Sequence, residues 1–142
     1  MQKKDLLNHI ASAGYNVGFG AKKSFATFDI VSKIPGWIGI ISLAVSIFGF
    51  YMDEMSSKHI AATFTLLSIG SLYINFYDSD KNKYEEAGKM QTSIFRKIER
   101  LYYNAKSEDA PDSVKFISQL GNLMREFDKT TITKQIFGSN WY

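Results

Sequence analysis

Residues 34–52 read IPGWIGIISLAVSIFGFYM, residues 60–77 read IAATFTLLSIGSLYINFY, and neither stretch carries a charged side chain. A helix rises about 1.5 Å per residue, so about 20 apolar residues cross a hydrocarbon core of roughly 30 Å. The two stretches supply 19 and 18 residues, and a polar turn at residues 53–59 separates them. Together they predict a membrane-spanning helical hairpin, around which the rest of the chain is organised.

Composition excludes several classes of protein. The chain has 142 residues, so the hairpin leaves no room for a separate enzyme domain. It contains no cysteine, which excludes disulfides and thiolate metal sites, and its net charge of +3 includes no block of Lys and Arg that indicates nucleic-acid binding. The first 33 residues lack the apolar core of a cleaved signal peptide, so we expect the hairpin to be retained. We therefore expect an all-α, oligomeric membrane protein that binds no nucleic acid.

The segment before the hairpin, residues 1–33, is expected to form an amphipathic cytoplasmic helix, because its apolar residues recur at three- and four-residue spacing. Gly14, Gly18 and Gly20 interrupt this helix and indicate either a kink or a close contact with another helix. Pro35 is expected at the start of the first spanning helix, where its missing N–H group costs least.

Two further helices are expected after the hairpin. Residues 78–107 predict a charged cytoplasmic helix with one apolar stripe, formed by Tyr84, Ala87, Gln91, Ile94, Ile98, Leu101 and Ala105. Residues 108–142 predict an amphipathic C-terminal helix and tail, with Asp112 or Ser113 as the N-cap. The apolar face of that last helix is expected at Val114, Ile117, Leu120, Met124 and Phe127.

The short turn of the hairpin returns both flanking helices to the same side of the membrane, so we expect these helices to pair. The residues expected in the contact are Val17, Phe25 and Phe28 before the hairpin and Ile94, Ile98 and Leu101 after it. Burying side chains of this kind is worth roughly 1.5–3 kcal/mol each.

Each spanning stretch carries a stripe of small or polar side chains on one side of its helical wheel. In the first stretch, the stripe is Gly39, Ser42, Ser46 and Gly49, a pattern that lets helix backbones approach closely in lipid. In the second stretch, the stripe is Thr65, Ser68, Ser71 and Asn75. Two interpretations of the second stripe stay open. Its polar groups either bond to their own helix and pack against the first span, or line an aqueous pathway in an oligomer.

The residues that usually carry chemistry do not converge in this sequence. His9 and His59 fall on opposite sides of the expected hairpin, so they form no metal site within one subunit. Neither span contains an ionisable residue, which argues against a proton relay, and the carboxylates fall on turns or solvated faces. We therefore expect no catalytic, metal or cofactor-binding site, no cofactor, and a protein that is not an enzyme.

The distribution of lysine predicts the topology. The lysines that flank the hairpin are Lys22, Lys23, Lys33, Lys81 and Lys83, whereas the turn carries Lys58 alone. Cytoplasmic segments of membrane proteins carry an excess of Lys and Arg. Both termini are therefore expected in the cytoplasm, and the turn on the opposite side.

The order of these parts carries a resemblance to a known family. Gly18-Phe-Gly-Ala-Lys-Lys-Ser-Phe25 precedes a span that begins Ile34-Pro-Gly-Trp37, and a tight turn, a second span and a charged helix through Leu101-Tyr-Tyr103 follow. Over residues 6–107 this arrangement resembles the SLATT family, the SMODS and SLOG-associating two-transmembrane effectors of bacterial anti-phage and nucleotide-signalling conflict systems. The resemblance implies an inner-membrane effector that forms a pore or disrupts the membrane. Its implied partners are the lipid bilayer, further copies of the chain and a separate sensor or nucleotide-signalling protein.

Other functions are compatible with the same residues. The hairpin could serve a non-conducting anchor or scaffold that recruits a cytoplasmic partner through residues 116–142. A holin-like lysis protein and a soluble helical bundle with an apolar hairpin are further alternatives. Ion conductance separates the effector from the anchor, and solubility without detergent separates the soluble bundle from the other three.

Overall fold

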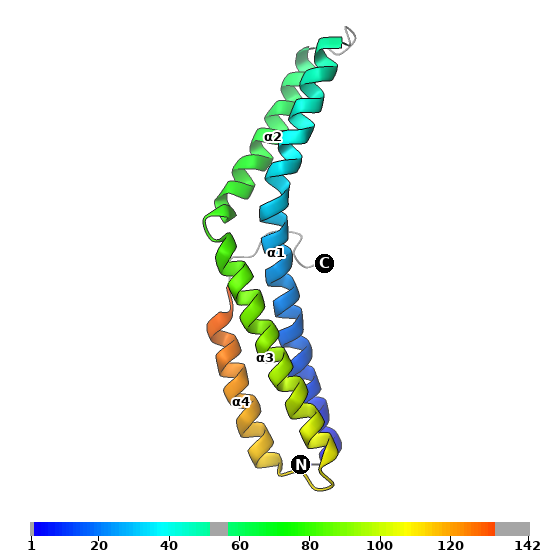
Figure 1. The fold of residues 1–142 in the computed structure, drawn as a ribbon, viewed down its shortest axis with the longest axis vertical. Coiled ribbons are helices and arrows are strands. Elements are labelled where there is room, and N and C mark those ends of the chain that lie inside the picture. The colour runs from blue at the N-terminus through cyan, green and yellow to red at the C-terminus, as the bar shows by residue number, and fades with distance from the viewer. Residues whose placement is uncertain (1, 52–56, 133–142) are drawn as a thin grey trace. The chain divides into compact units, whose positions relative to one another are not determined.

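The computed structural model describes residues 2–51 and 57–132, and its regular elements there are four α-helices (Figure 1). They are α1 (Lys3–Tyr51), α2 (Ser57–Asp78), α3 (Lys81–Ser107) and α4 (Ser113–Thr130). The predicted all-α fold is confirmed. The chain divides into two compact units, which we call the bundle unit (Met1–Ala26 with Lys83–Tyr142) and the hairpin unit (Thr27–Asn82).

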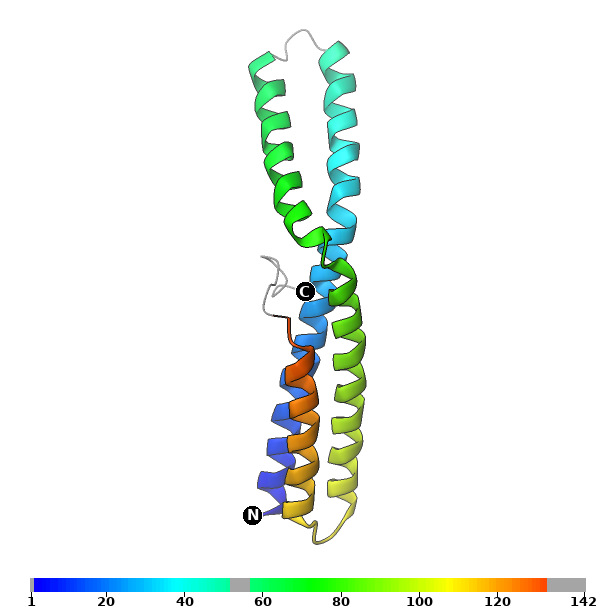
Figure 2. The same ribbon diagram turned by 90° about the vertical axis from the view of Figure 1, so that its left-hand side faces the viewer.

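Three helical segments lie side by side in the bundle unit: the first part of α1, α3 and α4 (Figures 1 and 2). Every residue of the predicted stripe on residues 78–107 is buried in α3, so that prediction is confirmed. Removing these side chains from water is the main favourable term in forming the unit. The buried core consists of Leu6, Ile10, Ala13, Val17, Ile94, Ile98, Leu101, Ala105, Phe116 and Leu120.

Glycines let the helices of the bundle unit approach one another closely. A Cβ atom placed on Gly88 of α3 would lie 2.9 Å from Cζ of Phe25 in α1. A Cβ atom placed on Gly20 of α1 would lie 3.0 Å from the ring of Phe127 in α4. A close-packed interior has no space for the added atom at either position. Of the two alternatives for the glycines of residues 1–33, Gly20 therefore supports close helix contact.

A buried polar node joins the three segments of the bundle unit. The hydroxyl of Ser24 donates to Oε1 of Gln91 at 3.0 Å, and Nε2 of Gln91 donates to the carbonyl of Thr130 at 3.3 Å. All three residues are buried. Because a buried polar group without a partner is costly, these bonds favour one register of the three segments.

Helix α4 begins as predicted, and Leu120, Met124 and Phe127 of its predicted apolar face pack on the core, whereas the first two residues of that face do not. The Asp112 carboxylate caps the helix by accepting hydrogen bonds from the backbone N–H groups two and three residues later, at 3.1 and 3.3 Å. Phe116 and Leu120 are buried, whereas Val114 is 79% exposed and Ile117 is 40% exposed. The predicted apolar face is therefore wrong at Val114 and Ile117. Apolar residues at three- and four-residue spacing mark two neighbouring faces of α4, and the face with the larger Phe116 ring packs inward.

Pro35 does not begin a helix, contrary to the prediction, because α1 continues through it. Proline offers no N–H group to the carbonyl of Val31, so it normally ends or kinks a helix. Spanning helices tolerate an internal proline, because in lipid the helix is the conformation that satisfies the remaining backbone groups. The requirement for a helical backbone thus outweighs the local signal at Pro35.

In the hairpin unit, the later part of α1 and α2 run antiparallel (Figure 2). Both helices are long and apolar enough to cross a membrane, and only 6% of each apolar stretch is buried. The core helix of a soluble protein would be mostly buried. The predicted pair of candidate spanning helices is therefore confirmed. The predicted turn falls largely on residues 52–56, outside the described residues.

Candidate functional site

The two helices of the hairpin unit contact each other through small residues. A Cβ atom placed on Gly49 of α1 would lie 3.0 Å from Cδ1 of Ile60 in α2. At the middle of the hairpin, a Cβ atom on Gly70 of α2 would lie 4.0 Å from Cδ1 of Ile38 in α1. Small residues at these positions let the two backbones approach, which is the usual geometry of helix packing in lipid.

Gly39 differs from the other members of the predicted small-residue stripe. Beyond the chain immediately around it, no described atom lies within 4 Å of a Cβ placed on Gly39. Ser42 and Ser46 are half-buried, and the hydroxyl of Ser46 donates to the carbonyl of Ser42 at 2.8 Å. The stripe therefore divides: Gly49 packs inside the hairpin, whereas Gly39 lies on its open surface.

The first half of the predicted polar stripe on α2 is exposed and bonded to its own helix. The hydroxyl of Thr65 donates to the carbonyl of Ala61 at 2.9 Å, and the hydroxyl of Ser68 donates to the carbonyl of Phe64 at 2.8 Å. Bonding of this kind lowers the cost of placing a hydroxyl in an apolar medium. Each hydroxyl oxygen keeps a lone pair that can accept a bond from water or from a neighbour.

The second half of the stripe lines a polar cavity of about 300 Å³ within the hairpin unit. Within the described residues, the side chains of Ser71 and Asn75 make no hydrogen bond. This half of the stripe consequently still needs partners, whereas the first half has its donors satisfied. The cavity is lined by Val31, Ser32, Pro35, Ser71, Ile74, Asn75, Asp78 and Lys81.

The residues predicted to pair the flanking helices fall into three positions. Val17 of α1 lies in the bundle core, together with Ile94, Ile98 and Leu101 of α3. Phe25 is half-buried, and its ring covers Gly88. Phe28 is assigned to the hairpin unit, so it lies outside this core.

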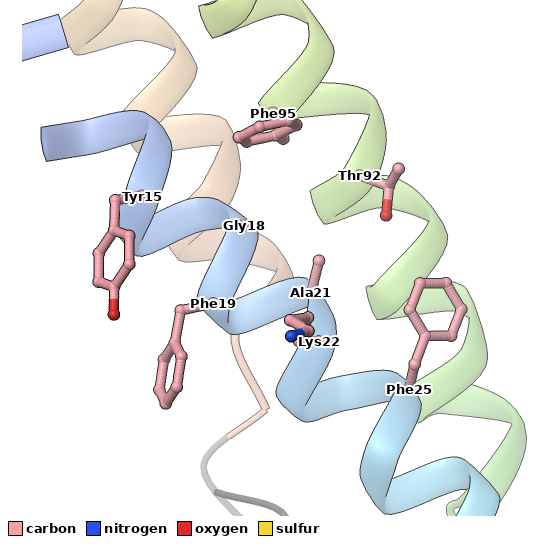
Figure 3. A pocket seen from close by; sticks show the side chains of 8 residues that line it. All are labelled: Tyr15, Gly18, Phe19, Ala21, Lys22, Phe25, Thr92 and Phe95. Atoms are coloured by element: carbon pink, nitrogen blue, oxygen red, sulfur yellow. The ribbon is translucent and has the colours of Figure 1, made fainter. Parts of the chain in front are cut away.

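The bundle unit also contains an apolar pocket of about 580 Å³, which the sequence analysis missed. Phe25 of α1 and Phe95 of α3 line it from opposite helices, and Tyr15 and Phe19 project from neighbouring turns of α1 (Figure 3). The rings of Tyr15 and Phe19 stack with their centroids 6.5 Å apart, and both side chains are exposed. The available signal was that these two aromatic residues fall outside the predicted apolar stripe, where exposed aromatic side chains mark interaction surfaces.

The described residues show no cluster of side chains that could hold a metal ion. Within residues 2–51 and 57–132, no three His, Asp or Glu side chains gather at a distance suited to a metal ion. His9 belongs to the bundle unit and His59 to the hairpin unit. What the hairpin unit offers is one side of α2 that carries Thr65, Ser68, Ser71 and Asn75, with the exposed Leu72 among them.

Comparison with known proteins identifies a family. A family model described as "SMODS and SLOG-associating 2TM effector domain 6" matches residues 1–142. Among curated proteins and among solved structures, none matches the chain.

Proposed function

This chain belongs to the family of SMODS and SLOG-associating two-transmembrane effector domains, and we propose that it oligomerises in the bacterial inner membrane and forms a pore. The assembled hairpins make the membrane leaky, which harms an infected cell and limits the spread of phage. A separate sensor or nucleotide-signalling protein triggers the assembly.

One observation carries this proposal: the polar stripe of α2 lies on a face that α1 does not fully cover. Thr65, Ser68, Ser71 and Asn75 are all exposed in a single chain, although they belong to a helix apolar enough to span a membrane. A polar group without a partner in hydrocarbon costs several kcal/mol. Water or a neighbouring hairpin is therefore the favoured cover for this face.

The two halves of the stripe favour different surroundings. Thr65 and Ser68 already donate to their own helix, so they suit a narrow and only partly wetted segment. Ser71 and Asn75 make no hydrogen bond within the described residues, so they suit a hydrated vestibule. The proposed pathway is therefore drier at Ser68 and more hydrated at Asn75.

Assembly requires surfaces that accept another hairpin, and the hairpin unit has them. Gly39 is open, so the backbone of a neighbour can approach it closely. Large apolar side chains along both helices of the hairpin unit are also exposed, and they remain available to lipid or to further copies. They are Trp37, Ile40, Ile41, Leu43, Ile47 and Phe48 in α1, and Leu66, Ile69, Leu72, Tyr73 and Phe76 in α2.

The proposed topology has both termini in the cytoplasm. The flanking lysines support it, because Lys22, Lys23 and Lys33 precede the first span and Lys81 and Lys83 follow the second. A cysteine introduced at Ser56, in a chain without other cysteines, should react with reagents only from the periplasmic side. Reaction from the cytoplasmic side alone would reverse the topology.

Leakage from liposomes tests the pore directly. Once it has assembled in the liposome membrane, the purified chain should release small dyes and retain large ones, and Ser68→Leu should reduce release by drying the narrow segment. Ile69→Leu is the matched control, because residue 69 is the adjacent position and 60% exposed, and it should leave release unchanged. If the wild type assembles in the membrane but releases no dye of any size, the proposal that it forms a pore is wrong.

A second candidate function is a non-conducting anchor, and the apolar pocket of the bundle unit favours it. Recruitment of a partner through residues 116–142 is less well supported, because Phe116 and Leu120 are buried in the bundle core and do not present a surface to a partner. The pocket between α1 and α3 presents Tyr15, Phe19 and Phe95 instead, and such a surface suits an apolar partner. Absence of conductance combined with capture of a partner by this pocket would favour the anchor.

A further inference from the structure

We propose that the polar cavity of the hairpin unit binds the headgroup of an aminophospholipid, one that carries a phosphate and a primary ammonium, as phosphatidylethanolamine does. This inference goes beyond pore formation, because it concerns the single hairpin before assembly; in the pore proposed above, Ser71 and Asn75 face water, so the lipid would leave the cavity on assembly. It rests on the position, the charges and the polar groups of one cavity.

The cavity lies where the apolar parts of both helices end. Ser32 and Pro35 border it on α1, at the start of the uncharged stretch that begins at residue 34. Ser71 and Asn75 border it on α2, near the end of the stretch that finishes at residue 77. The ends of spanning stretches lie at the level of lipid headgroups, so the groups that meet this cavity in a bilayer are headgroups and water.

The charges of the cavity match a headgroup with no net charge. The Asp78 carboxylate and the Lys81 ammonium form an ion pair at 3.0 Å, and both side chains are partly exposed, by 45% and 41%. Among the described residues, they are the two charged members of the lining. An exposed ion pair of this kind is weak, so a ligand can replace it. The ligand ammonium would bind Asp78 while its phosphate binds Lys81, which leaves neither charge unpaired.

Polar side chains beside the ion pair supply further hydrogen bonds. Ser32, Ser71 and Asn75 line the cavity, and within the described residues their side chains make no hydrogen bond. Two hydroxyls and one amide can donate to the oxygens of a phosphodiester and accept from an ammonium. The groups thus complement both halves of the headgroup.

The rest of the lining is apolar and consists of Val31, Pro35 and Ile74. Val31 and Ile74 are buried, so the exposed Pro35 is the residue of the three that can meet the start of an acyl chain. The same chemistry disfavours two common lipids. Phosphatidylglycerol brings no cation for Asp78, and the ammonium of phosphatidylcholine has no N–H group to donate.

Native mass spectrometry of the full-length protein tests the proposal. The protein is released from detergent micelles that contain equal amounts of phosphatidylethanolamine, phosphatidylglycerol and phosphatidylcholine, with acyl chains of different mass to identify each lipid. The wild type should retain phosphatidylethanolamine about tenfold more than either other lipid, which is the effect of one hydrogen bond between charged groups. Equal retention of the three lipids would overturn the proposal.

Asp78→Asn should lower the retention of phosphatidylethanolamine about tenfold and raise that of phosphatidylglycerol, because Lys81 then faces the ligand without its carboxylate. Lys81→Gln should lower the retention of both lipids. The matched control is Asp29→Asn, since Asp29 forms an ion pair with Lys33 at the same 3.0 Å in the same unit but outside the cavity. An equal effect of Asp29→Asn would show that only surface charge acts, and would overturn the proposal.

Two further measurements test whether the ligand is a membrane lipid and whether each variant still folds. Soluble phosphoethanolamine should compete only weakly, and competition equal to that of the lipid would overturn the assignment to a membrane lipid. Each variant is checked by circular dichroism. If Asp78→Asn loses helix, Asn75→Ala replaces it and should reduce phosphatidylethanolamine retention severalfold, whereas unchanged retention would overturn the proposal.

Discussion

The bundle unit and the hairpin unit use the same residue types in opposite ways. Ile98 of α3 is 1% exposed, whereas Ile69 of α2 is 60% exposed, although both are branched apolar side chains on helices. The bundle unit hides its apolar side chains among three helical segments, as a protein does in water. The hairpin unit leaves them outside, which is stable only where the surroundings are themselves apolar. The comparison teaches that one chain combines a unit packed as proteins are in water with a unit whose exposed apolar surface suits a membrane.

Single glycines are also either packed or open, although both kinds occur in each unit, since Gly49 of the hairpin unit is packed and Gly121 of the bundle unit is open. Gly88 lies under the ring of Phe25, with no space for a methyl group. Gly36 and Gly39 in the hairpin unit have no described side chain within 4 Å of a placed Cβ. Glycine therefore permits internal packing in the bundle unit, whereas at Gly39 it leaves a surface open for packing against another molecule.

The largest expected effect comes from placing a charge in the bundle core. Ile98→Asp should destabilise the bundle unit by about 4 kcal/mol or more, because it buries an unpaired carboxylate and removes core volume. The hairpin should still insert, since it has its own apolar surface. Hydrogen exchange of the full chain in nanodiscs measures the loss, and extraction with alkaline carbonate measures insertion.

Val114→Asp is the control for this substitution, because Val114 is 79% exposed in the same unit. It should leave exchange in α1 and α3 unchanged. If hydrogen exchange in the bundle unit of Ile98→Asp equals that of the wild type, or if the substitution abolishes membrane insertion, the distinction between the two units fails.

Two of the three glycines of the first span, Gly39 and Gly49, sharpen the comparison inside the hairpin unit. Gly49→Leu should weaken the contact between α1 and α2 by about 1–3 kcal/mol, because its Cβ meets Ile60 at 3.0 Å. Gly39→Leu should leave the hairpin intact and reduce oligomer formation. Crosslinking of the full chain in membranes reports the oligomer, and hydrogen exchange reports the hairpin. Identical behaviour of the two variants would contradict the division of the stripe.

A smaller effect is expected from adding single methyl groups in the bundle unit. Gly88→Ala should destabilise the unit by about 1 kcal/mol net, because the Phe25 ring must move and the gain in helix propensity offsets only part of the cost. Gly121→Ala, with open space around its Cβ, should stabilise α4 by up to about 1 kcal/mol. Thermal unfolding in detergent compares them, and equal midpoints would argue against the close contact.

The smallest effect concerns the start of α4. Asp112→Ala removes the carboxylate that accepts from two backbone N–H groups, so it should destabilise α4 by about 1 kcal/mol. Hydrogen exchange at residues 113–116 should rise severalfold, whereas exchange in α2 should stay the same. An increase in α2 of the same size would show that the two units do not respond separately.

Much of the fold could be predicted from the sequence, because long apolar stretches and periodic stripes follow directly from the geometry of a helix. The stripe of α3 from Tyr84 to Ala105 is an example, since charged residues on its other sides leave only one face to bury. The cap at Asp112 is another, because its interactions span only three residues.

Features that depend on long-range packing could not be predicted in the same way. Pro35 gives a local signal for a helix start, yet α1 continues through it. The face of α4 depends on how Phe116 fits against two other helical segments, which spacing alone does not encode. Likewise, the sequence identified Ser71 and Asn75 as polar but could not place them around one cavity with Ser32 and Lys81.

The central claim is that the polar stripe of α2 faces water in the assembled protein, and reactivity of introduced cysteines tests it most directly. Single cysteines at Thr65, Ser68, Ser71 and Asn75 are compared with cysteines at Leu66, Ile69 and Tyr73, using a water-soluble thiol reagent on activated protein in membranes. The account predicts rapid reaction at the first four positions and slow reaction at the other three. Equally slow reaction at all seven positions would contradict it, because the stripe would then be a dry packing face.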